Sequence, residues 1–395
     1  MLKEAVQQEA QSIFSGVVQH RRHLHSHPEL SFEEYHTSAF IKGELDALGI
    51  PWQAIAGTGI VALIKGEKEG NNEVVALRAD IDALPIMEVE GRSYGSQNKG
   101  VMHACGHDVH TSSLLGTAKI LTNLKAEFGG TVKLLFQPGE EKLPGGASLM
   151  IRDGALENPK PKAIIGQHVM PLIEVGKVGF RSGKYMASTD ELYVTVTGKG
   201  GHGAQPQLNI DPIVITAHII TALQQIVSRI ADPKMPTVLS FGKIVADGAT
   251  NVIPNEVKLE GTFRTFDEKW RAEAHQKMKK MAEGIAESMG AHCDFEVRKG
   301  YPFLVNEEVL TAQVRGFAEE YLGKENVLDL DLWMAGEDFA FYSQVTDACF
   351  YRLGTRNEAL GITSAVHTAQ FDIDENALAI STGLMAYIAL KRLGN

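Results

Sequence analysis

The stretch VVALRADIDALP at residues 74–85 joins an apolar run of strand length to two carboxylates that follow it directly. Two similar runs come later in the chain, TVKLLFQ at 131–137 and AIIGQH at 163–168. Helical patterns lie between these runs, notably at 109–126. Near-continuous apolar strands that alternate with helices are typical of a mainly parallel sheet covered on both faces. This part of the chain therefore predicts an α/β domain.

The sequence pattern changes near residue 186. In DELYVTVTG at 190–198, apolar residues alternate with polar ones, as in a sheet with one solvated face. Further elements are expected in the order helix, strand, strand, helix, strand, at 211–230, 237–244, 257–265, 267–289 and 293–297. That order is the split βαβ arrangement of a ferredoxin-like α+β domain. The predicted fold is an α/β domain at 1–185 and 298–395, with a mixed, mainly parallel sheet flanked by helices, and an inserted α+β domain at 186–297.

Composition excludes several classes of protein. The chain has 395 residues, 44% of them apolar, and a formal net charge of −11 without a long Lys/Arg run, so we expect no nucleic-acid partner. The chain has no run of about 18 apolar residues, so we expect no membrane span. The N-terminus lacks the apolar core of a signal peptide. The three cysteines, Cys105, Cys293 and Cys349, are too few for a disulfide framework and suit a reducing compartment. The expected location is the cytoplasm.

The densest cluster of chemically active side chains is MHACGHDVHT at 102–111, directly before a predicted helix. Cys105 and His107 are two residues apart, so in an extended stretch both would point the same way. Thiolate and imidazole are good ligands for zinc-like or manganese-like ions. His103 and His110 flank this pair and are expected to support the ligands. The alternative is a polar start of a helix with a buried cysteine.

The second candidate is QPGEEKLPGG at 137–146, where two adjacent carboxylates follow a strand. Glu140 and Glu141 cannot easily share one task. One can bind a metal ion while its neighbour acts as the general base towards an activated water. A solvated loop is the alternative, but the position at the carboxyl end of a sheet strand favours a functional site.

Three further candidates lie at or beyond strand ends. Asp80 and Asp82 follow the strand at 74–79, and they are expected to bind metal or to orient a ligand, unless they only form a turn before Pro85. His168 ends another apolar strand, where a histidine is often a hydrogen-bonded core residue. His367 lies in AVHTAQF near the C-terminus and means little alone.

Together these loops predict a dinuclear metal site. Soft and hard ligands recur at strand ends far apart in the sequence, namely Cys105, His107, Glu141, His168 and His367. Five such side chains and a bridging water can hold two ions roughly 3.5–4 Å apart, the usual spacing of paired-metal hydrolases.

The ordered motifs resemble one family. RADIDALP, MHACGHDVHT, QPGEE, HVMP, GKGGHGAQP, NVIPNEVKLEGTFRT and AGEDFA together resemble the aminoacylase/carboxypeptidase family of two-metal peptidases. They are most similar to its branch of N-acyl-amino-acid amidohydrolases, which includes hippurate hydrolase-like and indoleacetyl-amino-acid hydrolase-like enzymes. The resemblance extends from HLHSHPELSFEE to the C-terminal helix.

The resemblance implies a role for each motif. It implies a catalytic domain with an inserted lid domain, two divalent ions (manganese, zinc or nickel) on the five ligands above, and Glu140 as general base. Asp80 and Asp82 would then support the ligands. On the lid, His202 would polarise the scissile carbonyl, from the same chain or across a dimer. Asn251 and Arg264 on the lid and Gly336 in the AGEDFA motif would bind substrate. Arg264 is the candidate for gripping the substrate carboxylate. A surface histidine and an outward strand charge are the alternatives for His202 and Arg264.

The expected activity is hydrolysis of the amide bond of an N-acyl amino acid or small peptide. The expected assembly is a homodimer or higher homo-oligomer formed through the lid. Two rival functions remain open from the residues. Cys105 and a neighbouring histidine could form a cysteine hydrolase, or the chain could be a non-catalytic metal-dependent binding protein. Sensitivity to a chelator distinguishes a metal-dependent hydrolase from a cysteine hydrolase, which should survive metal removal. The carboxylate of Glu140 beside the ligands argues against a non-catalytic binding protein.

Overall fold

The computed structural model describes residues 1–69 and 72–394, and the chain divides into two compact units. The main unit comprises Met1–Tyr185, Val305–Leu332 and Phe341–Asn395. The inserted unit comprises Met186–Leu304 and Trp333–Ala340. The inserted unit thus reaches beyond 186–297, to Leu304, and takes in a second short segment. The lid and dimerisation roles of the inserted domain stay predictions.

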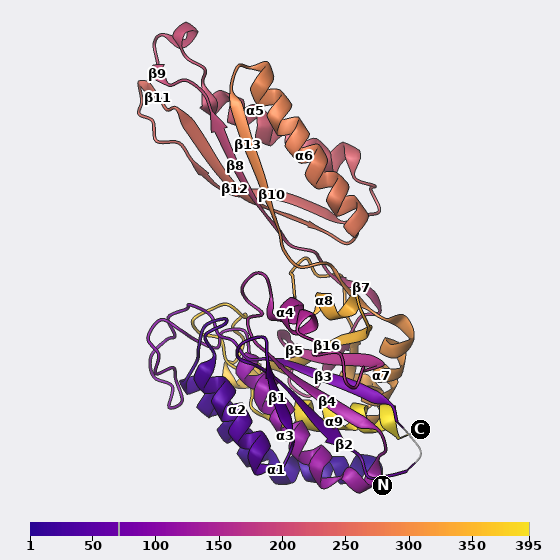
Figure 1. Ribbon diagram of the computed structural model, residues 1–395. Coiled ribbons are helices and arrows are strands. Elements are labelled where there is room, and N and C mark those ends of the chain that lie inside the picture. Colours follow the sequence, from indigo (N-terminus) through magenta and orange to yellow (C-terminus); the bar gives the residue numbers. More distant parts are fainter. Residues whose placement is uncertain (70–71, 395) are drawn as a thin grey trace. The chain divides into compact units, whose positions relative to one another are not determined.

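The main unit is built on an eight-stranded mixed sheet with the order β1-β2-β4-β3-β5-β16-β6-β15 (Figure 1). Its strands are β1 (Trp52–Ile55), β2 (Gly59–Lys65), β3 (Val74–Asp80), β4 (Thr131–Gln137), β5 (Ala163–Glu174), β6 (Val178–Phe180), β15 (Val327–Asp329) and β16 (Asp347–Arg356). The four central strands, β4, β3, β5 and β16, run parallel. Antiparallel pairs join β1 to β2, β2 to β4 and β16 to β6. The predicted fold class is confirmed.

Helices cover the main sheet. They are α1 (Leu2–Ser26), α2 (Tyr35–Ala47), α3 (His107–Asn123), α4 (Gly146–Arg152), α7 (Glu308–Leu322), α8 (Ala340–Ser343) and α9 (Asn376–Leu393). Side chains alternate along β4: Val132 and Leu134 join the large core that α1, α3 and α9 also contribute to. Lys133 points the other way and donates to the carbonyls of Ala155 and Glu157, just after α4. Both faces of the central strands are therefore covered, which explains why these strands are mainly apolar.

The inserted unit is an antiparallel sheet of order β10-β12-β8-β13 with two helices (Figure 1). In chain order its main elements are β8 (Asp190–Thr197), α5 (Pro212–Gln225), a π-helical turn (Ile226–Ile230), β10 (Thr237–Val245), β12 (Glu256–Thr265), α6 (Glu268–Ser288) and β13 (His292–Lys299). Leu192, Val194 and Val196 lie in one core with residues of both helices, as the alternating pattern predicts. The split βαβ order is confirmed. A two-stranded sheet pairs β9 (Gly201–His202) with β11 (Val252–Ile253), and β7 (Gly183–Met186) pairs with β14 (Leu304–Asn306).

One helix has the length and apolarity that a membrane span requires. It runs over Pro212–Ile230, in a chain whose sequence led us to expect no membrane span. In the structure Ile215, Ile219 and Leu223 are buried in the core of the inserted unit. Ile213 and Val214 stay 42% and 47% exposed, so the helix also presents an apolar outer face.

Candidate metal centre

The carboxyl ends of neighbouring strands bring the predicted site residues together. Asp80 is the last residue of β3 and pairs with Gln137, the last residue of β4. Glu140 and Glu141 follow β4 within four residues. His168 lies on β5, the other neighbour of β3. The prediction that His168 ends its strand is wrong, because β5 continues to Glu174. Parallel strands end at the same edge of a sheet, which is where α/β proteins usually place their sites.

A glycine sets the geometry of the Cys105 loop. Gly106 adopts a left-handed conformation (φ +82°) directly before α3. A Cβ atom at this position would lie 2.5 Å from Cγ2 of Val169 on β5. Only glycine therefore allows the loop to approach β5 so closely, and this approach carries Cys105 and His107 to the strand that bears His168.

The loop that carries His367 is tied to the same place. The backbone N–H of His367 donates to the carbonyl of Ala104 at 2.7 Å. His367 has a positive φ of 62°, which is uncommon for a residue other than glycine. A strained residue at this position is typical of a functional site.

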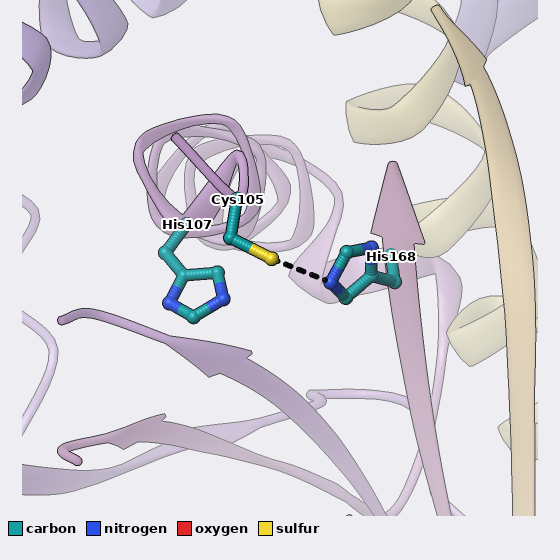
Figure 2. Close-up of side chains that lie close together, drawn as sticks. All are labelled: Cys105, His107 and His168. Atoms are coloured by element: carbon teal, nitrogen blue, oxygen red, sulfur yellow. Dashed lines mark hydrogen bonds between the residues drawn. The ribbon is translucent and has the colours of Figure 1, made fainter. Parts of the chain in front are cut away.

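The structure brings all five predicted ligands into one cluster. Sγ of Cys105 lies 3.4 Å from Nε2 of His168 and 3.3 Å from Nε2 of His367. Figure 2 shows Cys105, His107 and His168, whose ligand atoms lie within 4.8 Å of one another. Cys105, Glu141 and His367 form a second such group, and Nε2 of His367 lies 3.1 Å from Oε1 of Glu141. Cys105 therefore belongs to two groups, each of which could hold an ion.

Glu140 lies beside this cluster. It forms a third group of possible ligands with His107 and Glu141, and its Oε2 is 4.0 Å from Nε2 of His107. Its side chain is only 8% exposed. Glu141 thus belongs to both groups, with Cys105 and His367 and with His107, whereas of these two groups Glu140 belongs only to that of His107.

The two aspartates after β3 hold histidines in position. Asp82 accepts from Nδ1 of His107 at 3.1 Å, and Asp80 accepts from Nδ1 of His110 at 2.6 Å. Nε2 of His110 is already used, because it accepts from the backbone N–H of Val169 at 2.9 Å. His110 is therefore a supporting residue, whereas Nε2 of His107 remains available to a metal ion.

His168 has a matching arrangement. Its Nδ1 donates to the backbone carbonyl of Val169 at 2.7 Å, so Nε2 is the nitrogen that faces Cys105. Burial and the nearby Arg352 guanidinium hold the pKa of His168 well below its ordinary value. A neutral imidazole with a free Nε2 is the form that binds metal ions.

The carboxylates of the cluster shift the pKa values of Cys105 and His107 in ways that favour bound cations. Burial raises the pKa of the Cys105 thiol well above its ordinary value, and the carboxylates of Glu141 and Glu140 raise it further. Burial disfavours a charge on His107, yet Asp80 and Asp82 outweigh it and raise the pKa of His107 to about 10. Both shifts reflect the negative charge that surrounds these two side chains, and bound cations would offset it.

The residues fit a pair of divalent ions. Nε2 of His107 is buried and has no hydrogen-bond partner among the described residues, although a buried polar atom normally has one. The donor set is one thiol, three imidazoles and one carboxylate, which suits zinc-like and manganese-like ions. His103 also has both ring nitrogens buried without a hydrogen-bond partner in the described structure, and it lies in none of the ligand groups.

Two buried arginines belong to the site although the sequence analysis did not single them out. Arg78, on β3, donates to Asp80 at 2.6 Å and to Gln137 at 2.9 Å. Arg352, on β16, is paired in register with His168 on β5 and donates to the hydroxyl of Tyr185 at 2.7 Å. The sequence could have indicated both arginines, because each is a cationic residue inside an otherwise apolar strand. Such a residue is rarely buried without a partner.

The inserted unit holds the other predicted residues in two separate places. His202 and Asn251 lie together, since β9 pairs with β11 and the N–H of Gly203 donates to the carbonyl of Asn251 at 2.8 Å. Both side chains are exposed, and Nδ1 of His202 accepts from the N–H of Ala204 at 3.1 Å.

Arg264 and Gly336 form the second place. NH1 of Arg264, on β12, donates to the carbonyl of Met334 at 2.9 Å. Gly336 lies against Thr189, whose Cγ2 would be 2.2 Å from a Cβ atom at that position. Burial lowers the pKa of Arg264. The remaining donors of its guanidinium are the part available to a ligand.

Comparison with known proteins gives a consistent result over the whole chain. The sequence profile of the peptidase family M20/M25/M40 matches residues 76–391. An N-acetyl-L-cysteine deacetylase of Bacillus subtilis is 42% identical over 374 residues, 94% of this chain and 87% of that protein. An N-acyl-L-amino acid amidohydrolase of Geobacillus stearothermophilus is 43% identical over 307 residues, 78% and 82% of the two chains. The crystal structure of the YXEP protein of Bacillus subtilis, described as a dinuclear metal binding peptidase, has a TM-score of 0.83 at 34% identity and covers 97% and 99%.

Proposed function

This chain belongs to the peptidase family M20/M25/M40, and from that premise we propose that it hydrolyses the amide bond of N-acyl amino acids or small peptides. The single observation that carries the proposal is the position of Glu140. A buried carboxylate lies next to a cluster of metal ligands, and it is separated from the ligand Glu141 by one peptide bond. A base beside a pair of ions is what hydrolysis by an activated water requires.

We assign two divalent ions to Cys105, His107, Glu141, His168 and His367. Bound there, divalent ions lower the pKa of water and polarise a carbonyl group. Glu140 then accepts a proton from the attacking water at a carboxylate oxygen and delivers it to the leaving amine nitrogen. Asp82 and Asp80 keep the imidazoles of His107 and His110 in fixed tautomers throughout.

The inserted unit would supply the remaining contacts. We assign His202 as the donor that stabilises the oxyanion, with Asn251 beside it. We assign Arg264 to the substrate carboxylate, since a guanidinium offers a fork of donors and only one of its nitrogens is used by Met334. Gly336 would line the same place as Arg264.

A cysteine hydrolase is disfavoured by the same geometry. A nucleophilic cysteine needs a depressed pKa and access to substrate. Cys105 is 6% exposed, and burial together with two nearby glutamates raises the pKa of its thiol. A non-catalytic binding protein has no use for Glu140 beside the ligands.

The substrate proposal follows from the relatives. Those named above carry the names of enzymes that act on N-acetyl-L-cysteine and on N-acyl-L-amino acids. A carboxylate in such substrates would give Arg264 its partner. We therefore propose N-acyl amino acids as the first class to test, with manganese, zinc or nickel as the ion.

We propose that two copies associate through the inserted unit. Strand β10 is an edge strand whose last residues, Ile244 and Val245, are 57% and 39% exposed. The exposed Ile213 and Val214 on α5 add apolar area in the same unit. An unpaired antiparallel edge can pair with its own copy about a two-fold axis.

The three unpaired cysteines support a reducing location such as the cytoplasm.

The test of the function is a screen of N-acetyl, benzoyl and indoleacetyl amino acids with the metal-free protein reloaded with each ion in turn. The Glu140→Gln variant is the control, because it keeps the shape of the side chain and removes the base. We expect it to bind two ions and to lose turnover by about 10²–10⁴-fold. Full activity in Glu140→Gln would contradict the assignment of the base.

A further inference from the structure

The turn that carries Glu140 is fixed from both sides at Gly139. The N–H of Gly139 donates to Oε1 of Glu34 at 2.8 Å, and its carbonyl accepts from the N–H of Gly146 at 3.0 Å. Gly139 has a left-handed conformation (φ +56°). Any movement of Gly139 would be passed to the next residue, Glu140.

Glu34 is a buried carboxylate whose hydrogen bonds point away from its own helix. It precedes α2 directly, and its side chain makes no hydrogen bond to the first backbone N–H groups of that helix. Glu29 takes that task, accepting from the N–H groups of His36 and Thr37 at 3.1 and 2.8 Å. Glu34 is thereby left to bind Gly139, which is 105 positions away in the sequence.

Both oxygens of Glu34 are used. Oε1 accepts from the N–H of Phe32 at 2.9 Å as well as from Gly139, and Oε2 accepts from the hydroxyl of Thr58 at 2.6 Å. The residue is fully buried. A buried carboxylate is stable only with such a set of donors, so its position, and with it that of Gly139, is closely determined.

Phe32 completes the contact with the turn. It has a φ of +68°, a conformation that costs energy for a bulky residue and persists only where the surrounding structure enforces it. A Cβ atom on Gly139 would lie 2.2 Å from Cε1 of the Phe32 ring. The ring therefore lies directly against the backbone that precedes the proposed base.

The adjacent ligand Glu141 has its own, separate tether. Its N–H donates to Oδ2 of Asp82 at 3.0 Å, and the same oxygen accepts from the hydroxyl of Ser31 at 2.6 Å. The segment Ser31–Glu34 thus reaches the turn by two routes, one that ends at Gly139 and one that ends at Glu141.

We propose that Glu34 and Phe32 are positioning residues for the general base: they hold Gly139 so that the carboxylate of Glu140 stays beside the metal cluster. This inference rests on the proposed function, since it presumes that Glu140 is the base. It gives a task to the SFEE motif at 31–34, which the metal site itself does not use.

The test compares Glu34→Ala with Glu34→Gln at saturating manganese. The alanine variant leaves the N–H of Gly139 without its acceptor, so kcat should fall about 10–100-fold, the usual cost of losing a supporting partner. The glutamine oxygen can still accept from Gly139 and Phe32 while its amide donates to Thr58, so kcat should recover to within about fivefold of wild type. KM and manganese affinity, measured by calorimetry, should change less than about threefold in both, because Asp82 still holds Glu141.

Asp374→Ala is the matched control. Asp374 is another buried carboxylate of the main unit, and it accepts from the N–H of Asn376 at 2.9 Å and from the side chain of Asn357 at 2.6 Å. It should lose stability without the selective loss of kcat. An equal fall of kcat in Asp374→Ala and Glu34→Ala, or no recovery in Glu34→Gln, would overturn the proposal.

A double-mutant cycle separates this inference from the proposed function. Adding Glu34→Ala to Glu140→Gln should cause no further loss, because a residue that acts through the base has nothing left to position. Multiplying losses would contradict the positioning role, and full activity of Glu140→Gln would instead contradict the base. If Glu34→Ala does not fold, Phe32→Ala is used in its place. We expect it to lower kcat about tenfold at unchanged KM, and an unchanged kcat would overturn the proposal.

Discussion

Asp82 accepts a hydrogen bond from Nδ1 of His107 across 3.1 Å, and both side chains are fully buried. Because a carboxylate only accepts, Nδ1 carries the proton and Nε2 is the ligand atom. The other oxygen of Asp82 accepts from the backbone of Glu141. One side chain therefore orients two ligands that are 34 positions apart in the sequence.

This double task makes Asp82 the most sensitive residue outside the ligand set. In Asp82→Asn one oxygen remains, and it cannot serve both His107 and Glu141. We expect the affinity for manganese or zinc, measured by calorimetry, to fall about 10–100-fold. Asp46→Asn is the control, because Asp46 accepts only an exposed bond from Trp52. Wild-type affinity in Asp82→Asn would show that the tautomer of His107 is fixed in another way.

Removal of metal should distinguish the two chemistries that Cys105 allows. We expect a chelator to abolish hydrolysis and manganese, zinc or nickel to restore it. Iodoacetamide should leave the metal-loaded enzyme active, because the thiol is buried. Assays of residual activity after each treatment decide the point. Activity that survives complete metal removal but not alkylation would favour the cysteine nucleophile.

A buried ion pair behind the site should govern the acid stability of the main unit. Burial opposes the charge of Asp108, but the guanidinium of Arg21, which donates to it at 2.9 Å, and the nearby His25 hold the pKa of Asp108 well below its ordinary value. A depressed pKa contributes stability that is complete above about pH 4, the pKa in the unfolded chain, and is lost as the pH falls below it.

We therefore expect Asp108→Asn to lower the free energy of unfolding by about 3–5 kcal/mol at pH 7. The difference from wild type should shrink below about pH 4. Urea unfolding followed across pH measures both. Glu358→Gln, which removes an exposed partner of Arg356, should cost about 1 kcal/mol or less. A difference for Asp108→Asn that does not change with pH would contradict the assigned ionisation.

Arg264 offers a test of the substrate carboxylate. Lysine keeps the charge and loses the fork of donors, so Arg264→Lys should raise KM for N-acyl amino acids about 10–100-fold. N-acyl amino acid amides lack the carboxylate and are the matched substrates, for which KM should hardly change. An equal effect on both substrate series would mean that Arg264 has only a structural role through Met334.

His202 should act on turnover instead of binding. Removing a donor to the developing oxyanion typically costs about 10²–10³-fold in kcat, and this is the loss expected for His202→Ala. Its exposed position on β9, in the two-stranded sheet that β9 forms with β11, makes a folding defect a small concern. Mixing His202→Ala with Glu140→Gln tests the source of the histidine, because activity restored in mixed dimers requires a histidine from the partner copy. An unchanged kcat in His202→Ala would remove this residue from the mechanism.

The sequence predicted those parts that carry a local signal. Apolar runs predicted β3 and β4 within a residue, and the change to alternating strands predicted the order of the inserted sheet. Cysteine, histidine and glutamate side chains next to predicted strands and helices predicted the ligand cluster, although His168 lies inside β5 and not at its end. Strands β1 and β2, at one margin of the sheet, were not singled out; β1 has only four residues, whereas β2 is as long as β3 and β4.

The supporting residues could not be predicted in this way. Glu34 precedes a helix and has the sequence context of a cap, but its partner Gly139 is 105 positions away. Arg78 has the context of a strand residue, but it holds Asp80 and Gln137. These contacts depend on which distant segments the fold brings together. A sequence pattern does not show which segments those are.

The central claim is that five side chains from distant segments of the chain bind two divalent ions beside Glu140. Anomalous diffraction from crystals soaked in manganese tests it most directly. We predict two peaks roughly 3.5–4 Å apart, with Cys105 between them, and His107, Glu141, His168 and His367 as further ligands. A single peak away from Cys105, or no peak among these residues at saturating manganese, would contradict the account.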